Sequence, residues 1–126
     1  MVPGVSLWLS KSLVAAVSKQ LGDGAVATAN LPRMHKALKA QRPDIATWSA
    51  ECTNLSALVV ADVSSGWESL AEAWRNTLAP EGVLLAIGGG SASEASRKLL
   101  CAGFTDLHQA TVGRKLVTSG RLGLQP

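Results

Sequence analysis

The chain has 126 residues, of which 47% are hydrophobic, and its formal net charge is +3. This length fits one domain, and the apolar content is enough to build a core, which argues against intrinsic disorder. No apolar run reaches the roughly 18 residues of a membrane span, and Met1–Gly4 lacks the basic start of a secretory signal. The sequence therefore predicts one domain over residues 1–126, with no membrane partner.

The first predicted strand covers Val5–Ser10, and a helix follows it at once over Lys11–Leu21. One face of that helix is apolar and consists of Leu13, Val14, Val17 and Leu21. A nucleotide-type cofactor needs glycines between strand and helix, so that the backbone can approach the ligand. Here the Lys11-Ser12 pair occupies the turn, without any glycine between Gly4 and Gly22. The sequence predicts a nucleotide-binding type of fold without the usual cofactor loop.

A second strand–helix unit follows, with a short strand of small residues over 25–29. Pro32 opens the next helix, where its missing N–H group costs nothing. That helix points Leu31, Met34 and Leu38 inward and Lys36 and Lys39 outward. The break at 42–44 ends it, and residues 45–48 form another short strand.

The second half alternates again, beginning with a continuous apolar strand over Ala57–Ala61 that is typical of a parallel sheet. The helix after Gly66 has an apolar face of Trp67, Leu70, Ala71, Trp74 and Leu78. A turn over 79–82 leads into a buried strand over 83–87. The last helix contains the apolar residues Ala92, Ala95, Leu99 and Leu100. Strands over 105–112 and 116–119 close the chain through a hairpin turn at 113–115.

This alternation predicts an α/β fold with a doubly wound, mostly parallel sheet, helices on both faces and a C-terminal antiparallel hairpin. The most site-like loop joins the strand over 83–87 to the last helix and consists of Gly88, Gly89, Gly90 and Ser91. Such a loop can be a weak anion site. The stronger interpretation is a structural turn, because Ser91 and Glu94 form a capping box at the start of the helix. Asp62, at the end of its strand, could contact a ligand or serve as a turn or cap residue.

The sequence gives no support for a metal or for nucleophilic catalysis. His35 and His108 lie in different elements, without other ligands at metal-binding spacing. Cys52 and Cys101 form no Cys-x-x-Cys pair, so we expect buried thiols in a reducing compartment. No catalytic, cofactor-binding or metal-binding residue is therefore predicted in this domain.

Basic residues are concentrated in the first third of the chain. Positions 1–42 contain six of them against the single acidic residue Asp23, and these six are Lys11, Lys19, Arg33, Lys36, Lys39 and Arg42. They could form a protein partner surface or a solvated face. No aromatic residue is interleaved with them, which argues against single-stranded nucleic acid as a partner.

Three stretches resemble class I methyltransferases, which use S-adenosylmethionine. The segment 78–85 resembles the family's turn into its fifth strand, the segment 100–104 resembles its turn before the final hairpin, and 58–62 stands where its fourth strand would be. The family's Gly-x-Gly motif in the first strand is absent.

The first strand, with Trp8 and the turn at Ser10–Ser12, resembles the N-terminal methyltransferase-like domain of the anamorsin family of cytosolic iron–sulfur assembly proteins. The segment 42–54 departs from that family by its length. The resemblance implies a non-catalytic interaction module with a diflavin reductase partner, a role in electron transfer, and a cytoplasmic location that extends to the mitochondrial intermembrane space. It also implies 2Fe-2S and 4Fe-4S clusters in a C-terminal region outside this chain, which would then be part of a longer protein.

Two other functions stay open at this point. One is an active S-adenosylmethionine-dependent methyltransferase with a divergent cofactor loop. The other is a small nucleic-acid-binding module, which salt-dependent binding would reveal. Under the non-catalytic interpretation, we expect the Trp8 indole to fill the space of an adenosine.

Overall fold

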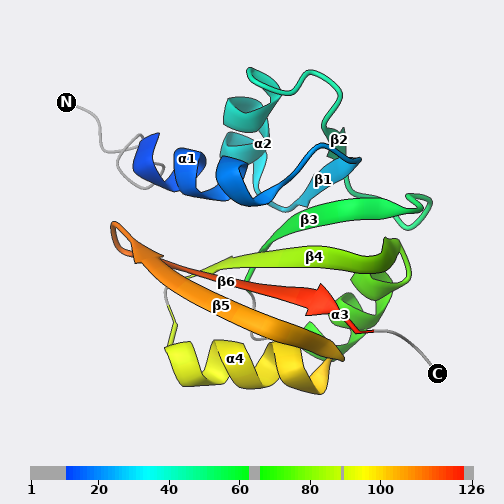
Figure 1. Cartoon of the computed structure of the whole chain (residues 1–126), viewed down its shortest axis with the longest axis vertical. Coiled ribbons are helices and arrows are strands. Elements are labelled where there is room, and N and C mark those ends of the chain that lie inside the picture. The colour runs from blue at the N-terminus through cyan, green and yellow to red at the C-terminus, as the bar shows by residue number, and fades with distance from the viewer. Residues whose placement is uncertain (1–10, 63–65, 89, 124–126) are drawn as a thin grey trace.

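The computed structural model describes residues 11–62, 66–88 and 90–123, so the expected strand over 5–10 and Trp8 lie outside the described residues. Within these ranges six strands form one sheet, and four helices flank it (Figure 1). None of the described helices is long and apolar enough to cross a membrane. In chain order the elements are α1 (Lys11–Gln20), β1 (Val26–Ala29), α2 (Pro32–Lys39), β2 (Ala46–Thr47), β3 (Leu55–Ala61), α3 (Trp67–Arg75), β4 (Leu78–Gly88), α4 (Ala92–Cys101), β5 (Phe104–Val112) and β6 (Lys115–Leu122).

The sheet has the order β2-β1-β3-β4-β6-β5. The first four of these strands run parallel, whereas β6 is antiparallel to both β4 and β5. This arrangement confirms the predicted doubly wound sheet with a C-terminal antiparallel hairpin. The chain first moves outward from β1 to β2 and then returns past β1 to β3, so the direction of winding reverses between β1 and β3.

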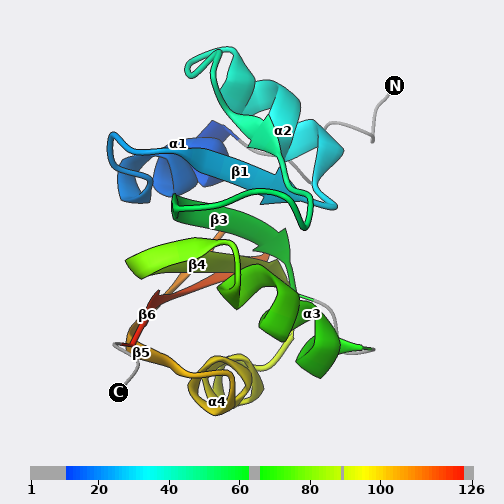
Figure 2. The same cartoon turned by 90° about the vertical axis from the view of Figure 1, so that its right-hand side faces the viewer.

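The two central strands are buried on both faces, as their continuous apolar sequences predict. In β3, Leu58 and Val60 belong to one hydrophobic cluster, and Val59 belongs to the other. Because successive side chains of a strand point to opposite faces, the two clusters are the two faces of the sheet. The helices α1 and α2 cover one cluster, and α3 and α4 cover the other. Figure 2 shows α1 and α2 toward the β1 end of the sheet and α3 and α4 toward the opposite end.

The boundary between α3 and β4 differs from the prediction. The sequence places Leu78 on the helix and a turn at 79–82, but α3 ends at Arg75 and β4 already begins at Leu78. Leu78 pairs with Leu55, and the next registered pair is Val83 with Ala57. The predicted turn is therefore a bulge within one long strand, because pairing with β3 continues on both sides of it.

The apolar residues of α4 divide between the surface and the core. Ala92 and Leu100 are exposed, and Leu100 is 56% exposed. Ala95 and Leu99, which lie one turn apart, are the buried residues of this helix. The apolar face of α4 is narrower than its composition indicates.

Candidate functional site

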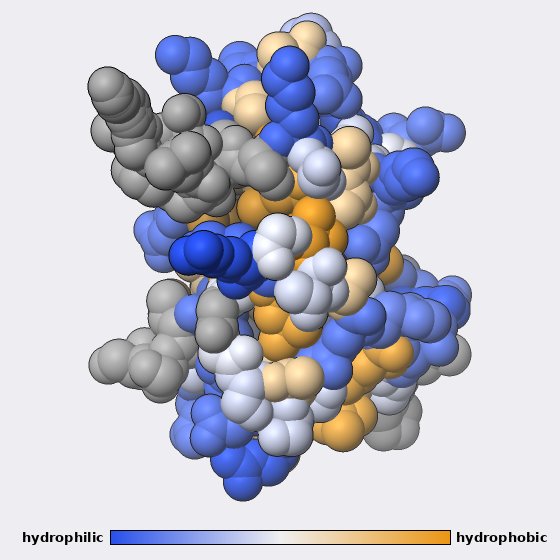
Figure 3. All heavy atoms as spheres, turned by 90° about the vertical axis from the view of Figure 1, so that its left-hand side faces the viewer, coloured by the Kyte–Doolittle hydropathy of each residue, from blue (hydrophilic) through white to orange (hydrophobic). Residues whose placement is uncertain are grey.

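The reversal between β1 and β3 positions the main candidate site. In open α/β sheets, ligands bind outside the carboxyl ends of the strands at such a topological switch point. A cleft of about 490 Å³ lies here. It is lined by residues that follow β1, by the ends of β3 and β4, and by the starts of α2 and β6, namely Leu13, Asn30, Leu31, Pro32, Arg33, Met34, Ala61, Asp62, Ile87, Gly88 and Lys115. Figure 3 faces this edge of the molecule and shows hydrophobic atoms in its middle with hydrophilic atoms on either side.

Asp62 is the acidic side chain of this cleft, and it is engaged within the protein. Its carboxylate accepts a hydrogen bond from the Lys98 ammonium group of α4, and the two form an ion pair. The Asp62 side chain is only 10% exposed. The Lys98 ammonium also lies 4.8 Å from the centroid of the Trp67 ring. The ion pair of Asp62 thus links the end of β3 to α4. The N-cap position of α3 is Gly66, so the predicted role of Asp62 as the cap of that helix is wrong.

The loop Gly88–Ser91 joins this site to α4, and Gly89 lies outside the described residues. Gly88 lines the cleft. It also packs closely against Asp62, since a Cβ atom at this position would lie 2.7 Å from Asp62 Cβ. Ser91 faces the helix instead, since its hydroxyl accepts the Glu94 N–H at 3.2 Å. The structural interpretation of Ser91 as the N-cap of α4 is confirmed. Gly90 does not line the cleft either, which separates Gly88 from the rest of the predicted anion loop.

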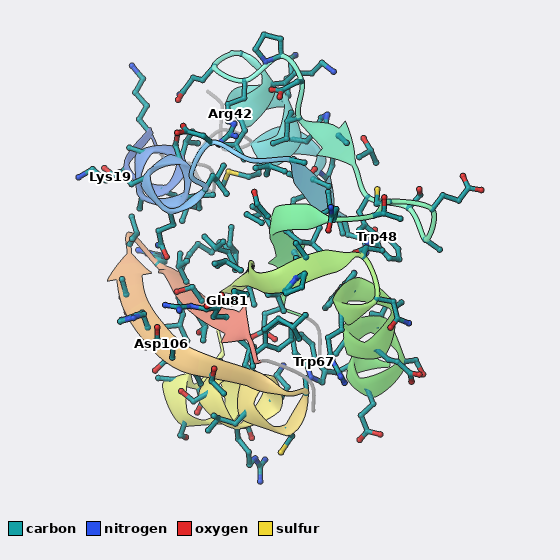
Figure 4. The ribbon with its side chains drawn as sticks, turned by 45° about the vertical axis from the view of Figure 1, so that its right-hand side comes forward. Lys19, Arg42, Trp48, Trp67, Glu81 and Asp106 are labelled. Atoms are coloured by element: carbon teal, nitrogen blue, oxygen red, sulfur yellow. The ribbon has the colours of Figure 1, made fainter. Side chains whose placement is uncertain are left out.

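The six predicted basic residues have different surroundings in the structure. Lys36 and Lys39 are exposed on α2, and Arg33 lines the switch-point cleft. Arg42 is held in place by hydrogen bonds to the backbone. The Arg42 guanidinium donates hydrogen bonds to the carbonyls of Gly22 and Gly24, in the connection from α1 to β1. A separate groove of about 630 Å³ between α1 and α2 is lined by Lys11, Val14, Ala15, Ser18, Lys19, Ala37 and Gln41. Figure 4 shows Lys19 extending outward from α1, while Arg42 lies against the molecule.

Among the described residues, no group of three or more His, Cys, Asp or Glu side chains could hold a metal ion. His35 instead makes a contact of 2.8 Å between its Nδ1 atom and the Thr28 hydroxyl. The expectation of buried thiols is wrong, because Cys101 is exposed and Cys52 is half-buried. The buried residues of α4 are Ala95 and Leu99, and Cys101 lies on a different face of the helix, which is exposed.

Sequence reasoning missed two residues of this site. Lys98 pairs with Asp62 across 36 positions of the chain, and no local pattern indicates that partnership. The sequence predicts Lys115 only as part of the hairpin turn, but it begins β6 and lines the cleft. Its place in the cleft follows from the topology, because a hairpin whose tip lies at the carboxyl edge of the sheet reaches the switch point.

No protein-family model and no curated protein matches the sequence, whereas solved structures share its fold. A S-adenosylmethionine-dependent methyltransferase from Thermotoga maritima matches with a TM-score of 0.65 at 14% identity, over 88% of each chain. Precorrin-6y C5,15-methyltransferase from Geobacter metallireducens matches with a TM-score of 0.65 at 10% identity, over 98% of this chain and 94% of that one. Human N-acetylserotonin methyltransferase matches with a TM-score of 0.71 at 13% identity, over 94% of this chain but 53% of its own. At these identities the likeness establishes a class I methyltransferase-like fold and nothing further.

Two features of the described residues bear on S-adenosylmethionine, which the N-acetylserotonin methyltransferase structure contains. The connection from β1 to α2 passes the switch point as Asn30-Leu31-Pro32, without the glycines that allow a backbone to approach such a ligand. The acidic side chain of the cleft, Asp62, is already neutralised by Lys98.

Proposed function

We propose that this methyltransferase-like domain acts by binding a protein partner and does not transfer methyl groups. The observation that carries the proposal is the turn before α1, where the sequence has Lys11-Ser12 in place of the glycines of a cofactor loop, together with the ion pair of Asp62 with Lys98. Without a close backbone approach and a free acidic group, the cleft lacks the means to hold S-adenosylmethionine. The fold then serves as a scaffold for its outer surfaces.

In its finer form, the proposal assigns the domain to cytosolic iron–sulfur assembly, as an anamorsin-type module that docks a diflavin reductase. The support is the sequence resemblance around residues 7–12 and in the helix that ends at Gly22–Gly24, together with exposed basic residues on α1 and α2. Lys11 and Lys19 border the groove between these helices, and its floor includes Val14 and Ala37. A basic rim around an apolar floor is suited to an acidic protein surface.

Isothermal titration calorimetry with S-adenosylmethionine tests the non-catalytic part of the proposal. We expect a dissociation constant weaker than about 100 µM, which corresponds to a binding free energy of roughly −5.5 kcal/mol. An active methyltransferase of the same fold serves as the positive control for the titration. Tighter binding would reject the proposal and favour the second candidate, an active methyltransferase, which the enzymes that share this fold favour.

Direct binding to a diflavin reductase tests the finer part. A complex that forms with the folded domain alone supports docking through this chain. Absence of a complex, in a domain that stays folded by circular dichroism, would limit the proposal to an interaction module with a different partner.

A further inference from the structure

We propose that the outer edge of β5 pairs with the same edge of a second copy of this chain, so that two sheets join through an antiparallel, two-fold symmetric contact. The proposal does not rest on the partner-binding function, because it uses a different surface from the helices α1 and α2. It follows from the backbone of β5, from the charges at its two ends and from the exposed side of α4.

The sheet edge formed by β5 is open to a further strand. β5 has nine residues and stands last in the sheet, with β6 as its neighbour among the described strands. The strand at the opposite edge, β2, has only two residues, and a short edge strand offers little to pair with. Proteins protect longer edges with Lys, other charged side chains or Pro, but residues 107–112 contain no Lys, Arg, Asp, Glu or Pro. Such an edge is a template for the strand of another chain.

The hairpin register shows which backbone groups of β5 point outward. Successive residues of an antiparallel strand direct their N–H and C=O groups alternately toward one side and the other. The residues that flank the two-residue turn at 113–114 pair with each other, so Val112 and Ala110 bond toward β6. Gln109 and Thr111 therefore direct their backbone groups away from β6. The bulge near the start of β5 lies outside this regular stretch.

Two-fold symmetry leaves three registers for the contact, with the axis at Gln109, Ala110 or Thr111, because outward residues of both copies have to face each other. The residue at the middle position favours the middle register. On this axis Ala110 takes a non-hydrogen-bonded position, where facing side chains come closest. Its side chain is small and exposed, so two copies can meet there without a clash.

The charges at the two ends of β5 favour the same register. With the axis at Ala110, Asp106 lies opposite Arg114 of a second copy, and the symmetry produces this pair twice. Neither of the other two registers places these residues opposite each other. The Asp106 carboxylate pairs with Arg121 of its own chain but remains 54% exposed, and Arg114 is exposed in the turn. Opposite charges that face each other across neighbouring strands stabilise their pairing.

The side of α4 next to this edge adds an apolar contact. α4 lies against β5 and β6, and its residues Lys98 and Cys101 line a groove that it shares with α3 (Figure 2). Leu100 stands about 100° further round the helix than the buried Leu99, on the side away from α3. Among the described residues it is the large hydrophobic side chain that is exposed, at 56%. A second copy paired on β5 brings its own α4 alongside, so Leu100 is covered in the dimer.

Sedimentation equilibrium of the folded chain over a range of concentrations tests the proposal. A short edge contact belongs to the weak class of interfaces, so we expect a dimer dissociation constant of about 100 µM. With rising concentration, the amides of Gln109 and Thr111 should become protected from hydrogen exchange, and the Leu100 methyl signals in NMR spectra should shift. A chain that stays monomeric up to about 1 mM, ten times that constant, would reject a second copy as the occupant of the edge. A dimer in which these two amides stay unprotected would place the contact elsewhere and overturn the proposal.

Charge variants complete the test. Ala110→Lys should weaken dimerisation at least about tenfold, because it places two like charges opposite each other on the axis. Arg114→Glu should weaken it about threefold to tenfold at low salt and less at high salt, since its charges are exposed. Gln20→Lys is the matched control, because it adds the same charge as Ala110→Lys at an exposed position on α1, and it should leave dimerisation unchanged.

Circular dichroism checks that each variant is folded, and Arg114→Glu, in an exposed turn, decides the test if Ala110→Lys does not fold. Unchanged dimerisation in the folded edge variants would reject the β5 contact. A control that weakens the dimer as much as Ala110→Lys would show general repulsion between basic chains, and the edge would again be rejected.

Discussion

Trp67 and Trp74 show how two aromatic residues one heptad apart build a core. Both are buried, with 6% and 1% of their surface exposed, and their rings meet edge to face with centroids 5.5 Å apart. This arrangement adds a specific ring contact to the burial of two large side chains. The Lys98 ammonium lies over the Trp67 ring and also pairs with Asp62, so this part of the core contacts the ion pair.

The Trp74→Ala variant should lower the free energy of unfolding by about 3–5 kcal/mol, because it empties an aromatic core site. Urea denaturation measures this loss. Leu100→Ala is the control, since Leu100 is 56% exposed, and its effect should stay within about 0.5 kcal/mol. Similar losses in both variants would contradict the described packing of α3 and α4.

Gly88 and Gly90 stand in the same loop but meet different surroundings. A Cβ atom at Gly88 would lie 2.7 Å from Asp62 Cβ, whereas a Cβ atom at Gly90 would have nothing within 4 Å. We therefore expect Gly88→Ala to cost about 1–3 kcal/mol of stability through overpacking. Gly90→Ala should change stability by no more than about 0.5 kcal/mol. Thermal and urea unfolding of both variants would measure the difference, and equal effects would show that the close approach of Asp62 is not required.

At the level of elements, Arg42 connects the end of α2 to the segment between α1 and β1, two parts of the chain that are distant in sequence. It follows α2, and its guanidinium binds carbonyls at positions 22 and 24, where α1 gives way to β1. The residue predicted as part of a docking face therefore also fixes the relative placement of α1 and α2. A substitution of Arg42 could therefore weaken partner binding by destabilising the fold, so it is unsuitable as a test of docking.

Arg42→Ala should lower the free energy of unfolding by about 1 kcal/mol, since it removes charge-assisted hydrogen bonds at a partly exposed site. Lys39→Ala, three residues earlier and exposed, should leave stability unchanged within about 0.5 kcal/mol. Chemical denaturation of the two variants side by side measures the contrast. If Lys39→Ala proved the more destabilising change, the role given to Arg42 would be wrong.

For the whole molecule, the distribution of charge predicts how partner binding responds to salt. If the domain docks a diflavin reductase through its basic helices, as proposed, the double variant Lys36→Glu with Lys39→Glu should weaken that binding, mainly through a slower association rate. The effect should shrink at high salt, because exposed charges are screened within roughly 8 Å at physiological ionic strength.

The control for that measurement is Arg97→Glu on α4, an exposed charge reversal on the other side of the sheet. It should leave the affinity unchanged while both proteins stay folded. If only the α4 variant weakens binding, the partner surface lies over α3 and α4, and the basic helices are not the docking face.

Most of the described elements and the class of fold can be predicted from the amino-acid sequence alone. Apolar residues at helical spacing predicted the described helices, and continuous apolar runs predicted the central strands, because these patterns are local properties of the chain. Glycine and proline located the ends of α1 and α2, and the Ser91 cap marked the start of α4, since each acts on the backbone within a few residues.

The residues that meet at the switch point could not be predicted from local sequence patterns. The pairing of Asp62 with Lys98, the bulge in β4 and the exposure of Cys101 each depend on segments that are distant in the chain. The place of Arg33 and Lys115 in one cleft follows from the return of the hairpin to the carboxyl edge of the sheet. Such contacts are fixed by how layers pack, and local patterns carry no information about which distant side chain will neutralise a charge.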